Sequence, residues 1–326
     1  MQSPTFIFYF TLSTLFIFLN LSNARTITVD QSGKGDFTTV QQAIDSIPSN
    51  NNEWTVIHLR AGVYNEKVVI PKDKPYIILE GESRRASVIQ YGDSGSSLDS
   101  TTFKLYAGNF LARDITFKNT YKHGIVEQQE GITWAPAFYI QGDKVSFYRC
   151  GFIGIQDTLT DWQGRHYFES CYIEGAIDFI WGGGQSIYQR CDIHVTAASI
   201  GVDNAYITAQ ARDSETDTSG FVFKYCSITG TGPALLGRAY RSHSRVLFFK
   251  SKFDNIIAPE GWYAWNAVGK EEGLTFAEAE CFGPGSDRSN RVKWEKNLQL
   301  EEVTKLVSKD LFINQDNWIE EQLKHQ

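Results

Sequence analysis

Residues 150–182 read CGFIGIQDTLTDWQGRHYFESCYIEGAIDFIWG. This stretch carries two cysteines, Cys150 and Cys171, and two aspartates, Asp157 and Asp178. In each pair the second residue follows the first by the same interval (171 − 150 = 178 − 157 = 21), so each aspartate lies seven residues after its cysteine (157 − 150 = 7). If this interval makes one coil of a stacked β-structure, the two carboxylates are neighbours in space.

The same interval belongs to a longer repeat. Six segments share a pattern of aromatic or aliphatic residues around a fixed centre, and the positions of successive centres differ by 37, 21, 20, 35 and 25. The centres are Arg113, Cys150, Cys171, Cys191, Cys226 and Ser251. A basic step of about 20 to 25 residues with insertions is typical of a parallel β-helix, in which each coil holds about three short strands. Crossovers between parallel strands are right-handed.

We therefore predict an all-β fold, a single-stranded right-handed parallel β-helix with a short N-terminal capping helix and a C-terminal helical tail. Apolar residues recur at helical spacing over residues 37–47 and end before Pro48, which predicts the cap. A second helical pattern over residues 298–312 predicts a tail that packs back along the coils. A β-sandwich, which also contains many short strands, stays open as the alternative.

Residues 1–24 are expected to be a secretory signal peptide. Residues 6–19, FIFYFTLSTLFIFL, are apolar, and residues 22–24, SNA, are small enough for a signal peptidase site. A membrane anchor is the rival interpretation, but the apolar run is shorter than the roughly 20 residues that cross a bilayer. Residues 25–326 would then form one secreted catalytic domain.

The formal net charge of −7 argues against nucleic acid or an anionic membrane as a partner. We expect a monomer. The in-phase cysteines Cys150, Cys171 and Cys191 either form a disulfide between adjacent coils or stack as small buried side chains, and the sequence leaves both open.

The two in-phase aspartates predict acid–base chemistry. Two carboxylates about 5 Å apart cannot both ionise cheaply, so one pKa rises and the other falls. Such a pair serves glycoside hydrolysis or ester hydrolysis, whereas a lyase needs a calcium site and a base. The chain has no run of acidic residues that resembles a calcium site, and it lacks the Asn-Thr-Asp and Asp-Asp motifs of β-helical polygalacturonases. Gln156 adds an amide donor that can face a developing oxyanion.

Four motifs in order carry a resemblance to a known family. They are GVYNE at 62–66, GIQDTL at 154–159, GAIDFIWG at 175–182 and LGRAY at 236–240. Together they resemble the signature of the plant pectinesterases (pectin methylesterases), and the similarity runs from about Thr28 to Trp318. Family members with an N-terminal inhibitor-like region carry it ahead of the first strand, so this chain resembles the class without that region.

The resemblance implies hydrolysis of the methyl esters of homogalacturonan to carboxylates and methanol. Asp178 matches the nucleophile, and Asp157 matches the acid that protonates methanol and then activates water. Arg238 matches the arginine that holds the nucleophile ionised and contacts substrate. Gln156 matches one of two glutamines that stabilise the oxyanion. No metal or cofactor is implied, pectin is the implied partner, and a proteinaceous pectinesterase inhibitor is a candidate second partner.

The chain departs from the family pattern beside the expected oxyanion site. Trp134 occupies the place of the second oxyanion glutamine, and loss of one such donor in another enzyme costs about 2.7 to 4 kcal/mol. A pectin-binding or catalytically weakened relative is therefore the alternative function. Four aromatic residues are candidates for stacking on sugar rings. They are Trp134, Tyr240, Trp262 and Trp265.

Overall fold

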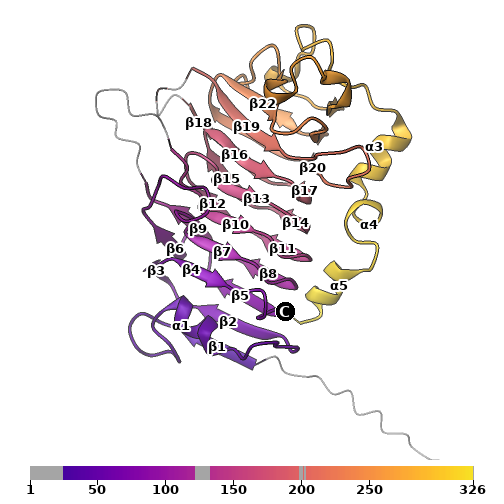
Figure 1. Cartoon of the computed structure of the whole chain (residues 1–326). Helices are drawn as coiled ribbons and strands as arrows, with labels where there is room; N and C mark the ends of the chain where they lie inside the picture. Colours follow the sequence, from indigo (N-terminus) through magenta and orange to yellow (C-terminus); the bar gives the residue numbers. More distant parts are fainter. Residues whose placement is uncertain (1–24, 122–132, 198–200, 202, 326) are drawn as a thin grey trace, which may run out of the picture.

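Each coil of the chain contains up to three short strands, and strands at equivalent positions of neighbouring coils pair in parallel. The computed structural model describes residues 25–121, 133–197, 201 and 203–325, and the expected signal peptide lies outside them. Within this part of the chain the strands form one sheet of ten strands and two sheets of eight. The predicted right-handed parallel β-helix is confirmed (Figure 1).

Sheet A is the ten-stranded sheet, and its strands pair in the order in which they follow one another along the chain. They are β1 (Arg25–Val29), β2 (Thr55–Leu59), β5 (Ile77–Gly81), β8 (Phe110–Arg113), β11 (Val145–Tyr148), β14 (Arg165–Glu169), β17 (Gln185–Gln189), β20 (Gly220–Lys224), β23 (Arg245–Phe249) and β26 (Thr275–Ala279).

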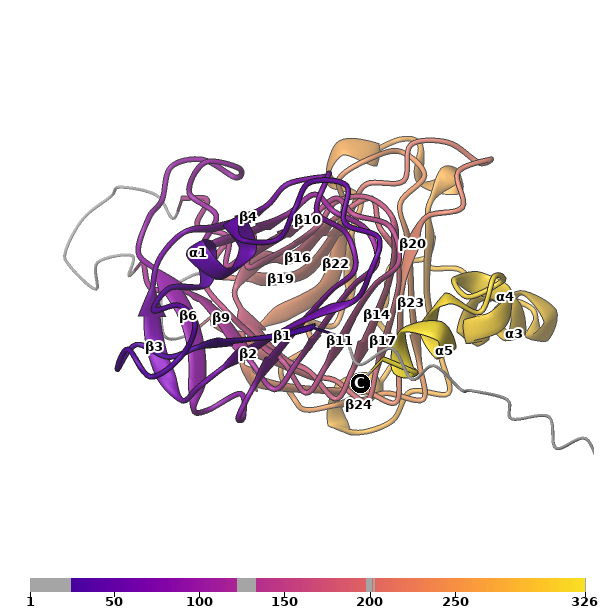
Figure 2. The ribbon, with the colours of Figure 1, turned by 90° about the horizontal axis from the view of Figure 1, so that it is seen from below.

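Sheets B and C form the other two sides of the coil. Sheet B consists of β3 (Gly62–Asn65), β6 (Ser87–Tyr91), β9 (Thr116–Asn119), β12 (Gly151–Ile153), β15 (Tyr172–Gly175), β18 (Asp192–Thr196), β21 (Ser227–Thr231) and β24 (Lys252–Phe253). Sheet C consists of β4 (Val68–Ile70), β7 (Phe103–Leu105), β10 (Phe138–Ile140), β13 (Leu159–Asp161), β16 (Ile177–Gly182), β19 (Ala205–Gln210), β22 (Ala234–Ala239) and β25 (Trp262–Tyr263). Figure 2 looks along the axis, where the three sheets surround one core.

Aromatic rings stack along the inside of the coil. Phe147, Phe168, Tyr188, Phe223 and Phe248 follow one another on sheet A, and their successive centroids are 4.9, 4.5, 4.5 and 4.5 Å apart. These distances are close to the roughly 4.7 to 4.9 Å between neighbouring strands, so each coil adds one ring to the stack. The rings fix the register of the coils.

The turn from sheet A to sheet B explains the repeat in the sequence. In successive coils Arg149, Ser170 and Arg190 adopt left-handed backbone angles, with φ of 53°, 55° and 52°. Non-glycine residues rarely adopt this conformation, so it marks a tight turn that each coil repeats. The residue after this turn points into the core. This column comprises Ile115, Cys150, Cys171, Cys191, Cys226, Ser251 and Cys281.

One centre of the predicted repeat was wrong. Arg113 pairs with Tyr148, so Ile115 rather than Arg113 occupies the column of Cys150. The reason is that Ala112, not Phe110, pairs with Phe147, and a small residue takes the position that phenylalanine fills in the next coil. An alignment on aromatic residues therefore places this segment two residues out of register.

The cysteines stack without forming disulfides. All five are free thiols. The Cys171 thiol contacts the Phe147 carbonyl oxygen at 3.6 Å, and the Cys191 thiol contacts that of Phe168 at 3.7 Å. Burial is the main cause that raises the pKa of both thiols. The in-phase cysteines therefore stack as small buried side chains, which is the second of the two alternatives that the sequence left open.

A buried ion pair lies inside the same coils. His166 Nδ1 is 2.5 Å from a carboxylate oxygen of Asp161, and its Nε2 donates to the Gly142 carbonyl oxygen at 2.9 Å. The Tyr188 hydroxyl donates to the other oxygen of Asp161 at 2.6 Å. A Cβ at Gly184 would lie 1.9 Å from Asp161, so glycine is needed there. Both imidazole nitrogens face acceptors, which favours the charged ring.

We expect His166→Gln to destabilise the fold by about 3 to 5 kcal/mol, because it leaves the Asp161 carboxylate buried without its cation. Burial lowers the pKa of His166, but the charge and hydrogen bond of Asp161 outweigh it and the net pKa is raised. The contribution is therefore complete below the unfolded pKa and is lost as pH rises through the folded pKa. Urea unfolding at several pH values checks this, because the difference from wild type should shrink at alkaline pH. A constant difference would contradict a charged His166.

Helices cover the first coil and one side of the molecule. The predicted cap is confirmed as α1 (Val40–Asp45), whose first amides, Val40 N and Gln41 N, donate to the carboxylate of Glu66 at 2.8 and 2.9 Å. This contact gives the glutamate of the GVYNE motif a structural task. Short 3₁₀ helices follow β25 and β26. They are η1 (Trp265–Ala267), η2 (Glu271–Gly273) and η3 (Pro284–Ser286).

The C-terminal tail packs back along sheet A, as predicted, but it is not one helix (Figures 1 and 2). It divides into α3 (Leu300–Val307), α4 (Lys309–Phe312) and α5 (Trp318–Leu323). The break falls at Ser308, whose hydroxyl accepts from the Leu311 amide and starts a new helix. No helix among the described residues is both long and apolar enough to cross a membrane.

Candidate active site

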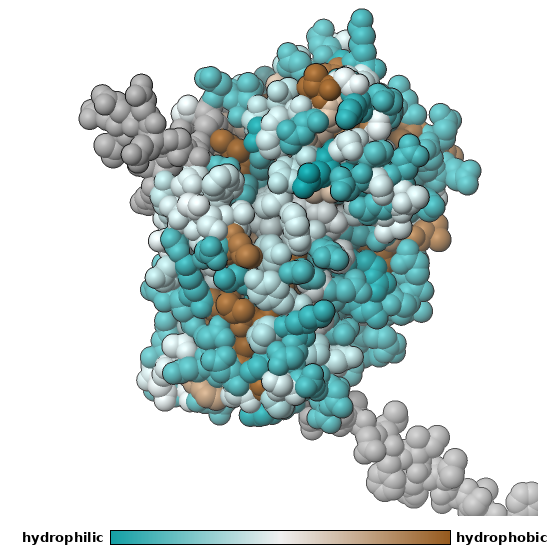
Figure 3. All heavy atoms as spheres, in the orientation of Figure 1, coloured by the Kyte–Doolittle hydropathy of each residue, from teal (hydrophilic) through white to brown (hydrophobic). Residues whose placement is uncertain are grey.

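A cleft of about 390 Å³ opens on the outer face of sheet C. Figure 3 shows this side of the molecule, where hydrophilic and intermediate residues dominate and hydrophobic residues form small separate spots. Ten residues line the cleft. They are Ser97, Trp134, Gln156, Asp157, Asp178, Trp181, Ala209, Arg238, Tyr240 and Trp265. The structure thus brings together all but one of the site residues predicted from the sequence.

The pairing of β13 with β16 places the two aspartates side by side. Leu159 pairs with Ile180, and Asp157 and Asp178 each lie two residues before these partners. Both aspartates have left-handed backbone angles, with φ of 58° and 48°. Such conformations are uncommon outside glycine and cluster at functional sites. The interval between the two aspartates therefore corresponds to one coil, as predicted.

Arg238 holds Asp178 from the next strand but one. Its Nε and one terminal nitrogen donate to the two oxygens of Asp178 at 2.7 and 2.6 Å. The guanidinium carbon lies 4.1 Å from the Tyr206 ring centroid and 3.9 Å from that of Trp265. The two rings thus fix the position of the guanidinium, and two of its nitrogens donate to the carboxylate. Arginine is suited to this position because its fork is planar.

Asp157 has a different environment. It is 4% exposed, and within the described residues its carboxylate has no hydrogen-bond partner or cation in contact. Burial raises the pKa of Asp157 well above the usual value, the charge of Asp178 adds to this, and Arg238 partly offsets it. Burial also raises the pKa of Asp178, but the hydrogen bonds and charge of Arg238 oppose that rise. The proton therefore belongs on Asp157, and Asp178 carries the negative charge.

Gln156 lies at the edge of the pair. Its backbone bridges to Ile177, and its carbonyl accepts from the Ala135 amide at 3.3 Å. The side-chain amide has no hydrogen-bond partner in the part of the chain that the structure describes. It is a free donor in the cleft, which fits the role that the resemblance implies.

Aromatic side chains form most of the remaining wall. The ring centroid of Trp181 lies 5.3 Å from that of Tyr240, and Tyr240 lies 5.8 Å from Trp265. Trp134 is 49% exposed and also lines the cleft. Trp134, Tyr240 and Trp265 thus line the cleft, and their stacking on a sugar ring stays a prediction.

The prediction for Trp262 was wrong. This side chain is 2% exposed and points into the coil, where its ring stacks on Phe276 with centroids 4.8 Å apart. Residues alternate between the two faces of a strand, and β25 turns Trp262 inward and Tyr263 outward. A buried ring cannot stack on a sugar.

The sequence did not identify Tyr206, Trp181 or Ser97 as site residues. Tyr206 lies in β19, which follows an insertion, and it pairs with Leu235 rather than Arg238, so no repeat in the sequence placed its ring beside the Arg238 guanidinium. Trp181 is within the quoted GAIDFIWG motif but lies three residues after Asp178, and regular alternation would place the two on opposite faces. The irregular pairing of β16 with β19 brings both to the cleft, and the sequence gives no sign of it. Ser97 comes from a turn, where periodicity gives no signal.

Comparisons with known proteins agree with this geometry. The family model Pectinesterase matches residues 26–316. Probable pectinesterase 55 and probable pectinesterase 29 of Arabidopsis thaliana are each 46% identical to this chain, over 90% and 91% of it and 90% and 89% of their own lengths. A pectin methylesterase from carrot has a TM-score of 0.84 at 30% identity, over 91% of this chain and 95% of its own. The chain therefore belongs to the pectinesterase family.

Proposed function

We propose that this protein hydrolyses the methyl esters of homogalacturonan in pectin, with Asp178 as nucleophile and Asp157 as acid and base. One observation carries the proposal: two buried carboxylates lie one coil apart, and only Asp178 is held by a guanidinium. That asymmetry supports different protonation states and hence different tasks. Membership of the pectinesterase family supports the choice of substrate.

In the first step a carboxylate oxygen of Asp178 attacks the ester carbonyl carbon. The carbonyl oxygen becomes an oxyanion, towards which the Gln156 amide donates. When the intermediate collapses, the bond from carbon to the methoxy oxygen breaks and that oxygen takes the proton of Asp157. Methanol leaves, and the galacturonate acyl group stays on Asp178.

In the second step water attacks the acyl carbon and gives a proton to the Asp157 carboxylate, which acts as base. The bond to Asp178 breaks, which restores its carboxylate beside Arg238. The products are a galacturonic acid group and the free enzyme with Asp157 protonated again. The cycle balances without a further reactant, because the proton taken from water replaces the one given to methanol.

Product analysis tests the reaction. Incubation with esterified homogalacturonan should release methanol and new carboxyl groups in equal amounts, because each ester yields one of each. Reducing ends and unsaturated uronides, the products of chain cleavage, should stay at the level of the blank. Chain shortening without methanol would contradict the proposal and favour glycoside hydrolysis or lyase chemistry.

The rate should depend on pH as a bell. Acylation needs ionised Asp178 and protonated Asp157, so kcat/KM rises as Asp178 ionises and falls as Asp157 loses its proton. Because burial raises both pKa values and raises that of Asp157 further, the maximum lies between two apparent pKa values of the pair. A fully esterified oligomer is the substrate of choice, since it has no carboxyl group of its own. A profile without a falling limb would contradict Asp157 as the acid.

Trp134 offers a test of the oxyanion site. The indole of Trp134 differs in shape from a glutamine side chain and carries no amide. Trp134→Gln would place a second amide donor in the cleft, in addition to that of Gln156. One donor of this kind is worth roughly 10²- to 10³-fold in kcat in another enzyme, and we expect a gain of about tenfold here because water already solvates the exposed site. The measurement is kcat for methanol release, with Trp134→Leu as the control that removes the ring but adds no donor. An equal kcat for both variants would mean that another group already serves the oxyanion.

We also propose that the chain is secreted and acts in the cell wall as a monomer. The apolar residues 6–19 support secretion, and the family supports a wall polymer as substrate. A proteinaceous pectinesterase inhibitor remains a candidate partner. Size-exclusion chromatography of the protein from a plant culture medium tests secretion and the monomer together.

A further inference from the structure

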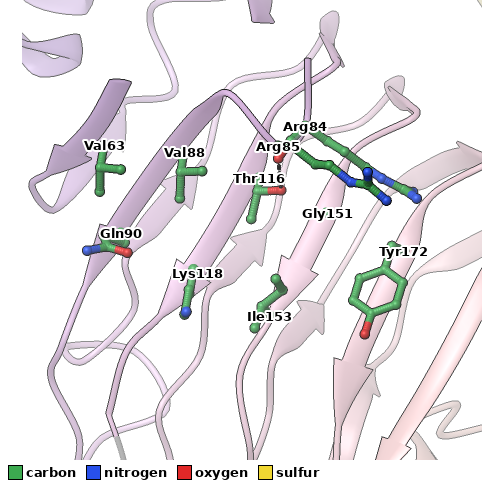
Figure 4. Close-up of a pocket in the computed structure, with 10 residues that line it drawn as sticks. All are labelled: Val63, Arg84, Arg85, Val88, Gln90, Thr116, Lys118, Gly151, Ile153 and Tyr172. Carbon is green, nitrogen blue, oxygen red and sulfur yellow. Dashed lines mark hydrogen bonds between the residues drawn. The ribbon is translucent and has the colours of Figure 1, made fainter. Parts of the chain in front are cut away.

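We propose that a basic groove on sheet B binds de-esterified, carboxylate-bearing stretches of homogalacturonan, the product that the catalytic cleft releases. The identity of the polymer rests on the proposed function, whereas the groove rests on the structure alone. It has a volume of about 540 Å³ and crosses β3, β6, β9, β12 and β15 (Figure 4). None of its lining residues belongs to the catalytic cleft, so it is a separate site.

The floor of the groove follows from one outward row of residues. Val63, Val88, Thr116, Gly151 and Tyr172 pair in succession across five coils. Thr116 is buried and Gly151 has no side chain, so the surface falls between Val88 and the ring of Tyr172. A Cβ at position 151 would lie 2.4 Å from the Thr116 hydroxyl, which explains the glycine. The pairing of β9, β12 and β15, which aligns Thr116, Gly151 and Tyr172, therefore creates the hollow.

Three cations face this hollow. Arg84 and Arg85 come from the turn between β5 and β6, and Lys118 comes from β9. Figure 4 shows both guanidinium groups extended over the strand of Gly151 towards Tyr172. The Thr116 hydroxyl donates to the Arg84 carbonyl oxygen at 2.6 Å and so anchors the turn. The lining contains three cations and no acid, in a chain whose net charge is −7.

The three cations lack anionic partners. Within the described residues no carboxylate lies within ion-pair distance of Arg84, Arg85 or Lys118. Two acids close to the groove in sequence are engaged elsewhere: Glu82 pairs with Arg60, and Glu174 accepts from the Tyr172 hydroxyl.

The guanidinium groups of Arg84 and Arg85 lie near each other in Figure 4, so their charges repel, and a bound anion relieves that repulsion. Guanidinium groups fit carboxylates in a bidentate manner. Tyr172 forms the end wall of the groove, where its ring lies between the Arg84 guanidinium, 5.7 Å from the ring centroid, and the ring of His194, whose centroid is 5.9 Å away. A hollow lined by cations that can bind carboxylates in this way matches a uronate polymer. A fully esterified chain has no carboxylates to offer.

The groove on sheet B and the catalytic cleft on sheet C are separated by the turn that joins β12 to β13. Ile153 lines the groove, and Asp157, four residues later (157 − 153 = 4), lines the cleft. A polymer that has lost esters at sheet C can therefore bring its new carboxylates to sheet B. Binding there would hold a partly de-esterified chain near the cleft.

The test is calorimetric titration with a fully de-esterified homogalacturonan oligomer. The variant is Arg84→Gln, Arg85→Gln and Lys118→Gln combined. The matched control removes three exposed lysines outside the groove that have no ion pair among the described residues, as Lys72→Gln, Lys293→Gln and Lys305→Gln. We expect the groove variant to raise Kd at least about tenfold, which corresponds to about 1.4 kcal/mol, and the control to leave Kd within about twofold. Added salt should weaken wild-type binding more than binding to the groove variant.

Equal Kd values for the two triple variants would overturn the groove. Methanol release from a short, fully esterified oligomer separates the two proposals, because this substrate needs the cleft alone and the groove variant should keep the wild-type rate on it. Methanol release together with equal Kd values would leave the function standing and refute the groove. Oligomer binding that depends on the groove, without methanol release, would refute the function and support an anion-binding role.

Discussion

Asp178→Asn is expected to lower kcat for methanol release by roughly 10⁴-fold or more, the scale seen when a covalent nucleophile is removed. The amide keeps the shape of the side chain and one acceptor for Arg238, but it cannot attack an ester. Asp178 is 6% exposed and both of its oxygens accept from Arg238, so the amide turns its NH2 group towards one guanidinium nitrogen and the variant should lose stability while still folding. Initial rates at substrate saturation and an unfolding curve are the two measurements.

Asp143→Asn is the matched control for this variant. Asp143 also makes a two-point contact with an arginine, Arg165, but at the surface and away from the cleft. Its kcat should stay within about twofold of wild type, as for most surface substitutions. A loss in Asp178→Asn no larger than in Asp143→Asn would remove Asp178 from the mechanism.

Arg238→Lys is expected to lower kcat/KM by roughly 10²- to 10³-fold, the scale of a lost electrostatic contact at a reacting centre. Lysine keeps the charge but loses the two parallel hydrogen bonds to Asp178 and the flat contact between Tyr206 and Trp265. The hydrogen bonds and charge of Arg238 lower the pKa of Asp178, against the effect of burial. With a weaker contact that pKa rises, so the rising limb of the pH profile should move to higher pH.

Arg149→Lys provides the comparison. Arg149 donates from Nε and one terminal nitrogen to the two oxygens of Asp114 at 2.8 and 2.6 Å, as Arg238 does to Asp178, but the Arg149 side chain is 55% exposed. This change should leave both the rate and the pH profile unaltered, because exposed ion pairs contribute little. A profile that does not move in Arg238→Lys would mean that Asp178 is kept ionised by another group.

The spacing in the sequence predicted the core of the site because a β-helix converts sequence interval into position. The interval from Asp157 to Asp178 equals one coil, so the sequence alone was enough to place the two carboxylates together. Arg238 is two strands further along sheet C, and an insertion before β19 breaks the interval there. For that residue the family motif was needed.

The errors have physical causes. Ala112 occupies a position where other coils have aromatic rings, so the register around Arg113 could not be read from ring positions. Trp262 begins a strand of two residues, too short for alternation to show which face it takes. The division of the C-terminal tail depends on one hydroxyl, that of Ser308, which caps a new helix inside an otherwise continuous apolar pattern.

The basic groove could not have been predicted from the sequence either. Its residues come from a turn and five strands spread over positions 63–172, and none of its three cations belongs to a recognisable motif. Only the register shows that Gly151 leaves a gap beside Thr116 and that the arginines reach over it.

The division of tasks between the two aspartates is the central claim, and the behaviour of Asp157→Asn towards a galacturonate nitrophenyl ester tests it most directly. Nitrophenolate leaves without a proton, so this variant should release one equivalent of it per enzyme in a rapid burst. It should then stall, because no base activates water for the second step. Asp178→Asn should show no burst. A burst from Asp178→Asn, or none from Asp157→Asn in a folded protein, would contradict these roles.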